Sequence, residues 1–305
     1  MTARTRRLAY TVVILVALGT VALAYSYFIE PSRLVINAQT ISIKGLDPAF
    51  DGLKIVAISD IHGGSNGADA ASLRRVVELV NDQEADVIVL LGDYVSEAGV
   101  GEPVASGPLK MPMNEIADNL SGFRARYGVF AVLGNHDGFY GDDIVAAELE
   151  RVGYRVLRNQ VATIERSGKR LRFLGLNDHM KLNSWYTFDS DVRKVMHNDG
   201  GNGSVIVLEH SPDIHFILNY FKTLGEDYKL MIAGHTHGGQ VWLPVVGRPI
   251  VPNSYGQKYA AGHVYDGGKD MFITTGVGSS ILPFRFMVPP EVAVLTLHAD
   301  PALPQ

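Results

Sequence analysis

Five short apolar runs, each leading into aspartate, asparagine or histidine, are the feature that most constrains this chain. Continuous apolar runs of this length, rich in β-branched residues, predict strands buried on both faces of a sheet. In open α/β sheets, sites form beyond the carboxyl ends of the strands. We therefore expect these polar residues to meet at one edge. The runs are Ile55-Val-Ala-Ile-Ser-Asp-Ile-His62, Val87-Ile-Val-Leu-Leu-Gly-Asp93, Val129-Phe-Ala-Val-Leu-Gly-Asn-His-Asp137, Val205-Ile-Val-Leu-Glu-His210 and Leu230-Met-Ile-Ala-Gly-His-Thr-His237.

The side chains delivered to this edge combine oxygen and imidazole donors, a mixture that suits divalent transition metals better than calcium. Any one motif is weak, since two histidines in a glycine turn are more often a polar loop than a metal site. Five motifs in order at strand ends are strong evidence for a common site. The candidate residues are Asp60, His62, Asp93, Asn135, His136, His210, His235 and His237.

The ordered set Asp-x-His, Gly-Asp, Gly-Asn-His-Asp, a later His and Gly-His-x-His resembles the calcineurin-like metallophosphoesterase superfamily, from about Leu53 to Leu297. The resemblance implies a hydrolase that acts on phosphoric esters with two divalent metal ions. It also implies an α/β fold, a four-layer α/β/β/α sandwich of two mixed sheets flanked by helices. The ligand set accepts Mn, Fe, Zn, Co or Mg to different degrees, so the sequence does not name the metal.

The resemblance also implies a role for each candidate residue. Asp93 corresponds to the carboxylate that bridges both ions, and His136 to the residue that steadies the phosphate or protonates the leaving oxygen. An imidazole suits that task because its usual pKa lies near neutrality. The first ion is assigned to Asp60, His62 and His237 with Asp93, and the second to Asn135, His210 and His235 with Asp93.

One departure from the family pattern affects His136. Protein phosphatases of the superfamily read Gly-Asp-x-x-Asp-Arg-Gly, where the second Asp orients the catalytic histidine. Here Ser96 stands in its place, which argues against a protein phosphatase and leaves the partner of His136 open. Tyr94 keeps a purple-acid-type phosphatase with a tyrosinate ligand as an alternative.

Two further residues are weaker candidates. Arg285, in Pro283-Phe-Arg-Phe286, is a candidate contact for a substrate phosphate, with a structural role as the alternative. Asp137 is expected only to cap or orient its loop.

The first 29 residues form a unit separate from the body at 30–305. Arg4, Arg6 and Arg7 precede 22 uncharged residues, Leu8 to Ile29, a length that can span a bilayer as a helix. We expect a retained N-terminal transmembrane helix in the inner membrane. A cleaved signal peptide is the alternative, because Ala22-Leu-Ala24 resembles a cleavage site. Arginines favour the cytoplasmic side, so the body is expected outside the cytosol, with the cytosolic side kept open.

The anchor and the closing segments resemble bacterial membrane-anchored phosphoesterases, some of which hydrolyse UDP-2,3-diacylglucosamine in lipid A synthesis. A lipid-linked phosphodiester or pyrophosphate is therefore one substrate prediction. That substrate is made in the cytosol, which conflicts with the expected orientation. The alternatives are an envelope phosphodiesterase or phosphomonoesterase outside the cytosol, and a metal-binding scaffold without activity.

Composition narrows the class further. The chain of 305 residues has no cysteine, which excludes disulfides, thiolate metal sites and a lipoprotein anchor. Its net charge of −5 argues against general nucleic-acid binding.

The remaining periodicity predicts elements between the motifs. Residues 97–113, rich in Gly and Pro, are either a surface excursion or a partly apolar lip that touches lipid or substrate. After Gln240 we expect mainly strands. Helices are expected at 71–83, 114–126, 142–152, 188–196 and 214–224, with strands at 34–46, 156–175 (a hairpin turning at Ser167-Gly168), 271–275 and 292–297.

Overall fold

The computed structural model of the chain describes residues 2–98, 107–182 and 184–300. Within these residues, two six-stranded mixed sheets pack face to face. The first sheet runs β1 (Val35–Lys44), β12 (Glu291–Asp300), β2 (Lys54–Ile58), β3 (Val87–Leu91), β4 (Val129–Val132) and β5 (Arg155–Val156). The second runs β10 (Gly262–Asp266), β11 (Lys269–Ile273), β9 (Tyr228–Ala233), β8 (Ser204–Leu208), β7 (Lys169–Gly175) and β6 (Gln160–Arg166).

The motif-bearing strands are parallel neighbours in each sheet. In the first sheet β2, β3 and β4 pair in parallel, and in the second β8 and β9 do so. Antiparallel pairs, β12 with β2, β6 with β7 and β10 with β11, make both sheets mixed. The carboxyl ends of the five strands therefore open at one edge, as the sequence predicted.

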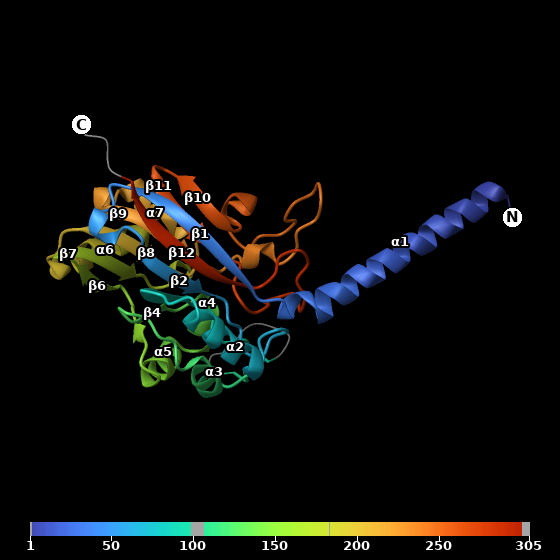
Figure 1. Cartoon of the computed structure of the whole chain (residues 1–305), viewed down its shortest axis with the longest axis horizontal. Helices are drawn as coiled ribbons and strands as arrows, with labels where there is room; N and C mark the ends of the chain where they lie inside the picture. The colour runs from blue at the N-terminus through green and yellow to red at the C-terminus, as the bar shows by residue number, and fades with distance from the viewer. Residues whose placement is uncertain (1, 99–106, 183, 301–305) are drawn as a thin grey trace.

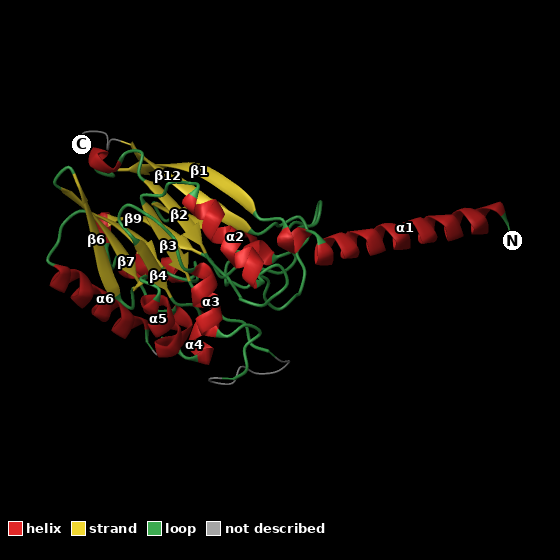
Figure 2. Ribbon diagram, turned by 60° about the horizontal axis from the view of Figure 1, so that its bottom comes forward, coloured by secondary structure: helices red, strands yellow, loops and turns green. Residues whose placement is uncertain are grey.

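Helices cover the outer face of each sheet, which confirms the four-layer sandwich (Figure 2). The first sheet packs against α2 (Ala70–Asn81), α3 (Met113–Leu120) and α5 (Asp142–Arg151), and the second against α6 (Trp185–Asp199) and α7 (Ile214–Phe221). The short α4 (Asn135–Tyr140) begins at the third motif. Alternate residues of a strand point to opposite faces. Thus Ile55 packs between the sheets while Val56 packs under the helices.

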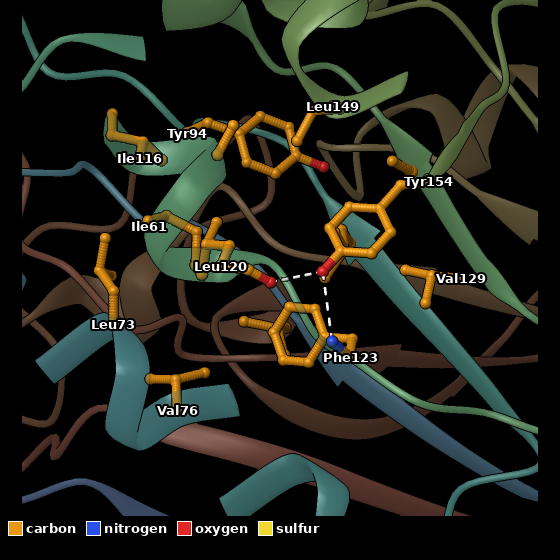
Figure 3. Packing of buried hydrophobic residues seen from close by; sticks show 14 of the residues in the cluster. Ile61, Leu73, Val76, Tyr94, Ile116, Leu120, Phe123, Val129, Leu149 and Tyr154 are labelled. Carbon is orange, nitrogen blue, oxygen red and sulfur yellow. Dashed lines mark hydrogen bonds between the residues drawn. The ribbon is translucent and has the colours of Figure 1, made fainter. Parts of the chain in front are cut away.

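Tyr94 is buried in the hydrophobic core between the first sheet and the helices that cover it, here called the outer core. Figure 3 shows its ring inside the cluster beside Leu149 and Ile116. The Tyr94 hydroxyl donates to the Val132 carbonyl at 3.2 Å, and burial raises the pKa of this phenol well above its usual value. A phenol buried in apolar packing cannot supply a tyrosinate ligand, so the purple-acid alternative is not supported.

Three differences from the sequence predictions have local causes. Helix α3 ends at Leu120, short of Arg126, because Gly122 turns at a φ of 99°. Helix α6 begins earlier than predicted, because Ser184 caps it by accepting from the Thr187 N–H. The stretch 240–259 is mainly loop rather than strand, and the predicted β-rich character begins at β10.

The expected lip falls partly outside the described residues, at 99–106. Its described ends form a short antiparallel contact, in which Glu97 pairs with Leu109 and the Lys110 N–H donates to Ser96. Met111 and Met113 are buried in the outer core. These two methionines therefore contribute to packing and do not form an exposed apolar surface.

The N-terminal segment forms one continuous helix, α1 (Ala3–Phe28), which projects from the domain (Figure 1). It is long and apolar enough to cross a membrane, although a signal sequence passes the same test. Its end is joined firmly to the domain: Ser26 and Glu30 are buried, and the Ser26 carbonyl accepts from the Arg285 N–H at 3.1 Å.

Candidate metal centre

The eight candidate residues meet at the common edge of the two sheets. Their ligand atoms form three overlapping clusters, Asp60–His62–His237, His62–Asp93–His136 and Asp93–His210–His235, and within each the atoms lie within 4.8 Å of one another. Asp93 is shared by the last two, and its Oδ2 lies 3.1 Å from His210 Nε2 and 3.6 Å from His62 Nε2.

Local backbone geometry explains why these residue types stand at the strand ends. Asp60, His62, Asp93, His235 and His237 all have φ between 42° and 68°. Few residues other than glycine, asparagine, aspartate and histidine adopt this region readily. Such strained conformations gather at functional sites, where the surrounding structure maintains them. The left-handed turns end the strands and redirect the side chains toward the edge.

The motif glycines are required because segments of backbone touch here. A Cβ on Gly92 would lie 2.5 Å from the Gly134 nitrogen, and one on Gly134 would overlap the Asp93 carboxylate. A Cβ on Gly234 would overlap Ser59 and lie 2.6 Å from Asp60 Oδ2. Gly92, Gly134 and Gly234 are therefore needed because any larger residue would prevent the neighbouring motif from approaching.

The polar atoms fit divalent cations. His62 Nε2 lies 3.2 Å from His237 Nε2, and His210 Nε2 lies 3.0 Å from His235 Nδ1. Asp60 Oδ1 and Asn135 Oδ1 are buried and have no hydrogen-bond donor among the described residues. Lone pairs left without donors are costly unless a cation or water occupies the space. The donor set therefore suits metal ions.

The outer nitrogens of two histidines fix their orientation. His62 Nδ1 donates to the Val95 carbonyl at 3.2 Å, and His210 Nδ1 donates to the Leu91 carbonyl at 2.8 Å. Such bonds select the tautomer whose Nε2 is free to bind a metal. Burial lowers the pKa of His62 and of His235 to about 3, so both are neutral near pH 7, the form that binds metal ions.

His210 shows the opposite effect. Burial lowers the pKa of this imidazole, but the carboxylates of Asp93 and Asp60 outweigh burial and raise it well above its usual value. The same carboxylates would hold a divalent cation, which competes with that proton.

Asp137 holds the loops together. Its carboxylate accepts from the backbone N–H groups of Asp93 and Tyr94 at 2.8 Å and of Gly134 at 2.9 Å, and it is fully buried. It therefore orients the ends of β3 and β4, in agreement with the role expected from the sequence.

Glu97 is the partner of His136 that the sequence left open. Glu97 Oε2 lies 2.8 Å from His136 Nδ1, and both side chains are partly exposed. Burial lowers the pKa of His136, but the carboxylates of Asp93 and Glu97 outweigh it and raise the pKa to about 9. Glu97 follows Ser96 directly, so the sequence signal was an acidic residue one position beyond the family's aspartate.

A second group missed by sequence reasoning lies beside His210. Glu209 Oε1 accepts from the backbone N–H of His179 at 3.1 Å and lies 3.3 Å from the His179 ring nitrogen. Asp178 is close to the same imidazole, at 3.7 Å. The signal for Glu209 was its position next to the His210 motif.

Arg285 lies behind the metal cluster and is fully buried. Its guanidinium donates to the carbonyls of Thr275, Gly278 and Val288, and Nη2 is 3.4 Å from His237 Nδ1. The described residues that line the pocket over the cluster do not include it. This placement favours the structural alternative for Arg285.

We expect Arg285→Ala to lower the free energy of unfolding by about 3 kcal/mol, because each buried carbonyl left without a donor costs about 1–3 kcal/mol. Urea unfolding followed by circular dichroism measures the change. Arg158→Ala is the matched control, since Arg158 forms an exposed pair with Asp143; such pairs contribute about 0–1 kcal/mol. Equal stability of the two variants would contradict a structural role for Arg285.

The sequence profile described as calcineurin-like phosphoesterase matches residues 53–239, which include all the candidate metal ligands. The chain belongs to this family. Members are metal-dependent phosphoester hydrolases, and the clustered aspartate and histidine side chains could hold a metal ion.

Three relatives illustrate the range of this phosphoesterase family. The chain is 30% identical to the uncharacterized metallophosphoesterase YkuE of Bacillus subtilis, over 90% of this chain and 89% of the relative. It is 29% identical to the phosphodiesterase YaeI of Escherichia coli, over 80% and 82%. It is 26% identical to a zebrafish (Danio rerio) transmembrane protein with a metallophosphoesterase domain, over 84% of this chain and 56% of the relative.

Proposed function

We propose that this phosphoesterase holds two divalent cations and hydrolyses a phosphodiester or pyrophosphate bond. The observation that carries the proposal is the position of Asp93 between the imidazoles of the two proposed ion sites. Its Oδ2 lies 3.6 Å from His62 Nε2 and 3.1 Å from His210 Nε2. Asn135 completes the second set with a neutral amide oxygen, which limits the negative charge facing an anionic substrate. Two such ions, when bound, would place positive charge beside the phosphoryl oxygens and lower the pKa of a bound water.

The other side chains act on the substrate directly or through His136. His136 faces the pocket together with Asp93 and Asn135. It steadies the phosphate and donates a proton to the leaving oxygen, as general acids do. Glu97 holds the His136 ring through Nδ1, which leaves Nε2 as the atom that carries the transferred proton.

We further propose a lipid-linked substrate, with UDP-2,3-diacylglucosamine of lipid A synthesis as the first candidate. A helix long and apolar enough to anchor the domain in a bilayer supports a lipid-linked substrate, and a relative described as a phosphodiesterase supports a phosphodiester bond. An envelope phosphodiester outside the cytosol is the second candidate, because Arg4, Arg6 and Arg7 favour placing the domain on the outer face of the inner membrane.

Hydrolysis by the full-length protein with added manganese tests the proposal. UDP-2,3-diacylglucosamine and an aryl phosphodiester are compared, with Asp93→Asn as control. Formation of UMP and the acylated sugar phosphate would support the first candidate and a cytosolic site. Cleavage of the aryl diester alone would keep the chemistry and favour an envelope substrate, and no cleavage of either would contradict the proposal.

We also propose that α1 is retained as a single-pass anchor, since its 26 residues exceed the apolar core of a signal peptide. The intact mass of the membrane-extracted protein tests retention, and the mass of a chain that begins at Tyr25 would contradict it. Protease treatment of spheroplasts tests the side, because an outward-facing domain is digested and a cytosolic one is protected.

A further inference from the structure

Two loops at the mouth of the pocket expose an unusual amount of apolar surface. We call their exposed side chains the collar: Val245, Val246, Ile250, Ile281, Leu282 and Met287. Val245 is fully exposed and Ile281 is 91% exposed. Contiguous apolar patches rimmed by polar residues mark contacts with membranes or partners.

The two loops are joined to each other. The Trp242 N–H donates to the Phe286 carbonyl at 2.9 Å, and the Gln240 side-chain amide donates to the carbonyls of Leu282 and Phe284. The collar is therefore one surface built on the Gly-His-Thr-His-Gly-Gly-Gln motif, which ends at Gln240.

The collar is continuous with the end of α1. The Asn66 side chain donates to the carbonyls of Tyr27 at 2.7 Å and Pro283 at 2.9 Å, and the Arg285 N–H donates to the Ser26 carbonyl. Phe28 and Ile29, at this end of α1, are themselves more than half exposed. Figure 1 shows the orange and red loops projecting from the end of the domain at which α1 leaves.

Charge and backbone geometry agree with an apolar environment. Residues 240–252 and 279–290 contain no acidic residue, although the chain carries a net charge of −5. Val245 and Ile281 have φ of 73° and 28°. Positive φ is an outlier for β-branched residues, and water-facing turns normally place glycine or asparagine there. These loops keep large apolar side chains at their tips instead.

We propose that the collar inserts into the lipid bilayer beside α1, so that the pocket opens onto the membrane surface. Ile250, Ile281 and Leu282 line the same pocket as His136 and His237. A substrate would then keep its apolar part in the bilayer while its phosphoester reaches the metal centre. This inference rests on the proposed retention of α1, and it deepens the proposed function by making the substrate a membrane amphiphile.

The two tryptophans of the chain provide the test. Trp242 belongs to the collar loop, whereas Trp185 is the first residue of α6 and stacks on His179, outside the collar. Helix α6 lies away from α1 in both views (Figures 1 and 2). Full-length Trp185→Phe and Trp242→Phe proteins, each with one tryptophan, are placed in phosphatidylcholine vesicles with brominated acyl chains. We expect bromine to quench Trp242 and to leave Trp185 as bright as in unbrominated vesicles.

A collar variant sharpens the test. Val245→Asp, in the Trp185→Phe background, places a charge at the tip, and aspartate tolerates positive φ better than valine. We expect quenching of Trp242 to fall, while hydrolysis of a soluble aryl phosphodiester is unchanged because Val245 does not line the pocket. Tyr186→Asp is the control, since Tyr186 is an exposed residue of α6.

The outcomes separate this inference from the proposed function. Equal quenching of the two tryptophans, or none for Trp242, would overturn the inference even if the enzyme is active. A Trp242 shielded from iodide but not quenched by bromolipid, in a protein that dimerises, would assign the collar to a second copy of the chain and would also overturn it. Selective quenching of Trp242 in a protein that cleaves no phosphoester would support insertion of the collar into the bilayer and contradict the proposed hydrolytic function.

Discussion

Asp93→Asn is expected to remove bound metal and abolish turnover. Asp93 Oδ2 is the carboxylate oxygen closest to both His62 and His210, and Oδ1 accepts from the His136 N–H at 2.9 Å. An amide in this place loses the negative charge and puts an N–H group either beside His62 and His210 or against the His136 N–H. The loss of metal affinity should exceed the roughly 10–100-fold that outer-shell partners contribute.

Metal analysis of the purified protein and turnover of an aryl phosphodiester measure these effects together. Asp118→Asn makes the same chemical change at an exposed carboxylate paired with Arg151, and it should alter neither. A variant at Asp93 that keeps its metal and its activity would contradict the bridging role.

His136→Ala is expected to separate catalysis from metal binding. We assign His136 to the substrate and not to an ion, so metal content should stay at the wild-type level. Turnover should fall by roughly 10²–10⁴-fold, the usual contribution of a general acid or base. His298→Ala, at an exposed histidine paired with Asp51, should change neither quantity.

Glu97→Gln tests how His136 is positioned. The amide preserves the shape of the side chain but removes the charge beside Nδ1, so we expect a fall of about 10-fold in turnover, in the range of outer-shell partners.

Loss of metal in His136→Ala would make His136 a ligand, which its proximity to His62 and Asp93 allows. Full activity of His136→Ala would contradict the role of His136 as general acid.

The placement of the site illustrates what a local pattern predicts well. Apolar runs such as Val87 to Leu91 are buried on both faces wherever they occur, so they predict central strands, and parallel strands bring their carboxyl ends together. The clustering of Asp60, Asp93 and His237 followed from this rule. The assignment of each residue to an ion came from the family resemblance.

Features made by contacts distant in sequence were less predictable. No periodicity shows that Arg285 points inward to the carbonyls of Thr275 and Gly278, or that Tyr94 packs beneath α3 and α5. Glu97 was not predicted as the partner of His136, because the family pattern places the orienting aspartate at position 96. The segment after Gln240 was expected to be rich in strands, because apolar β-branched residues such as Val245 occur both in strands and in loops that expose them.

The local residue pattern by itself predicted the buried strands, the polar residues at their carboxyl ends and the apolar N-terminal helix, because burial and strand direction follow from that pattern. The resemblance to the family added the four-layer sandwich. Only the tertiary structure decided which atoms meet: Glu97 with His136, Arg285 behind His237, and the collar beside the end of α1. Those pairings depend on how loops from distant parts of the chain pack together. Packing of that kind is a property of the whole fold and leaves no periodic signal in any one segment.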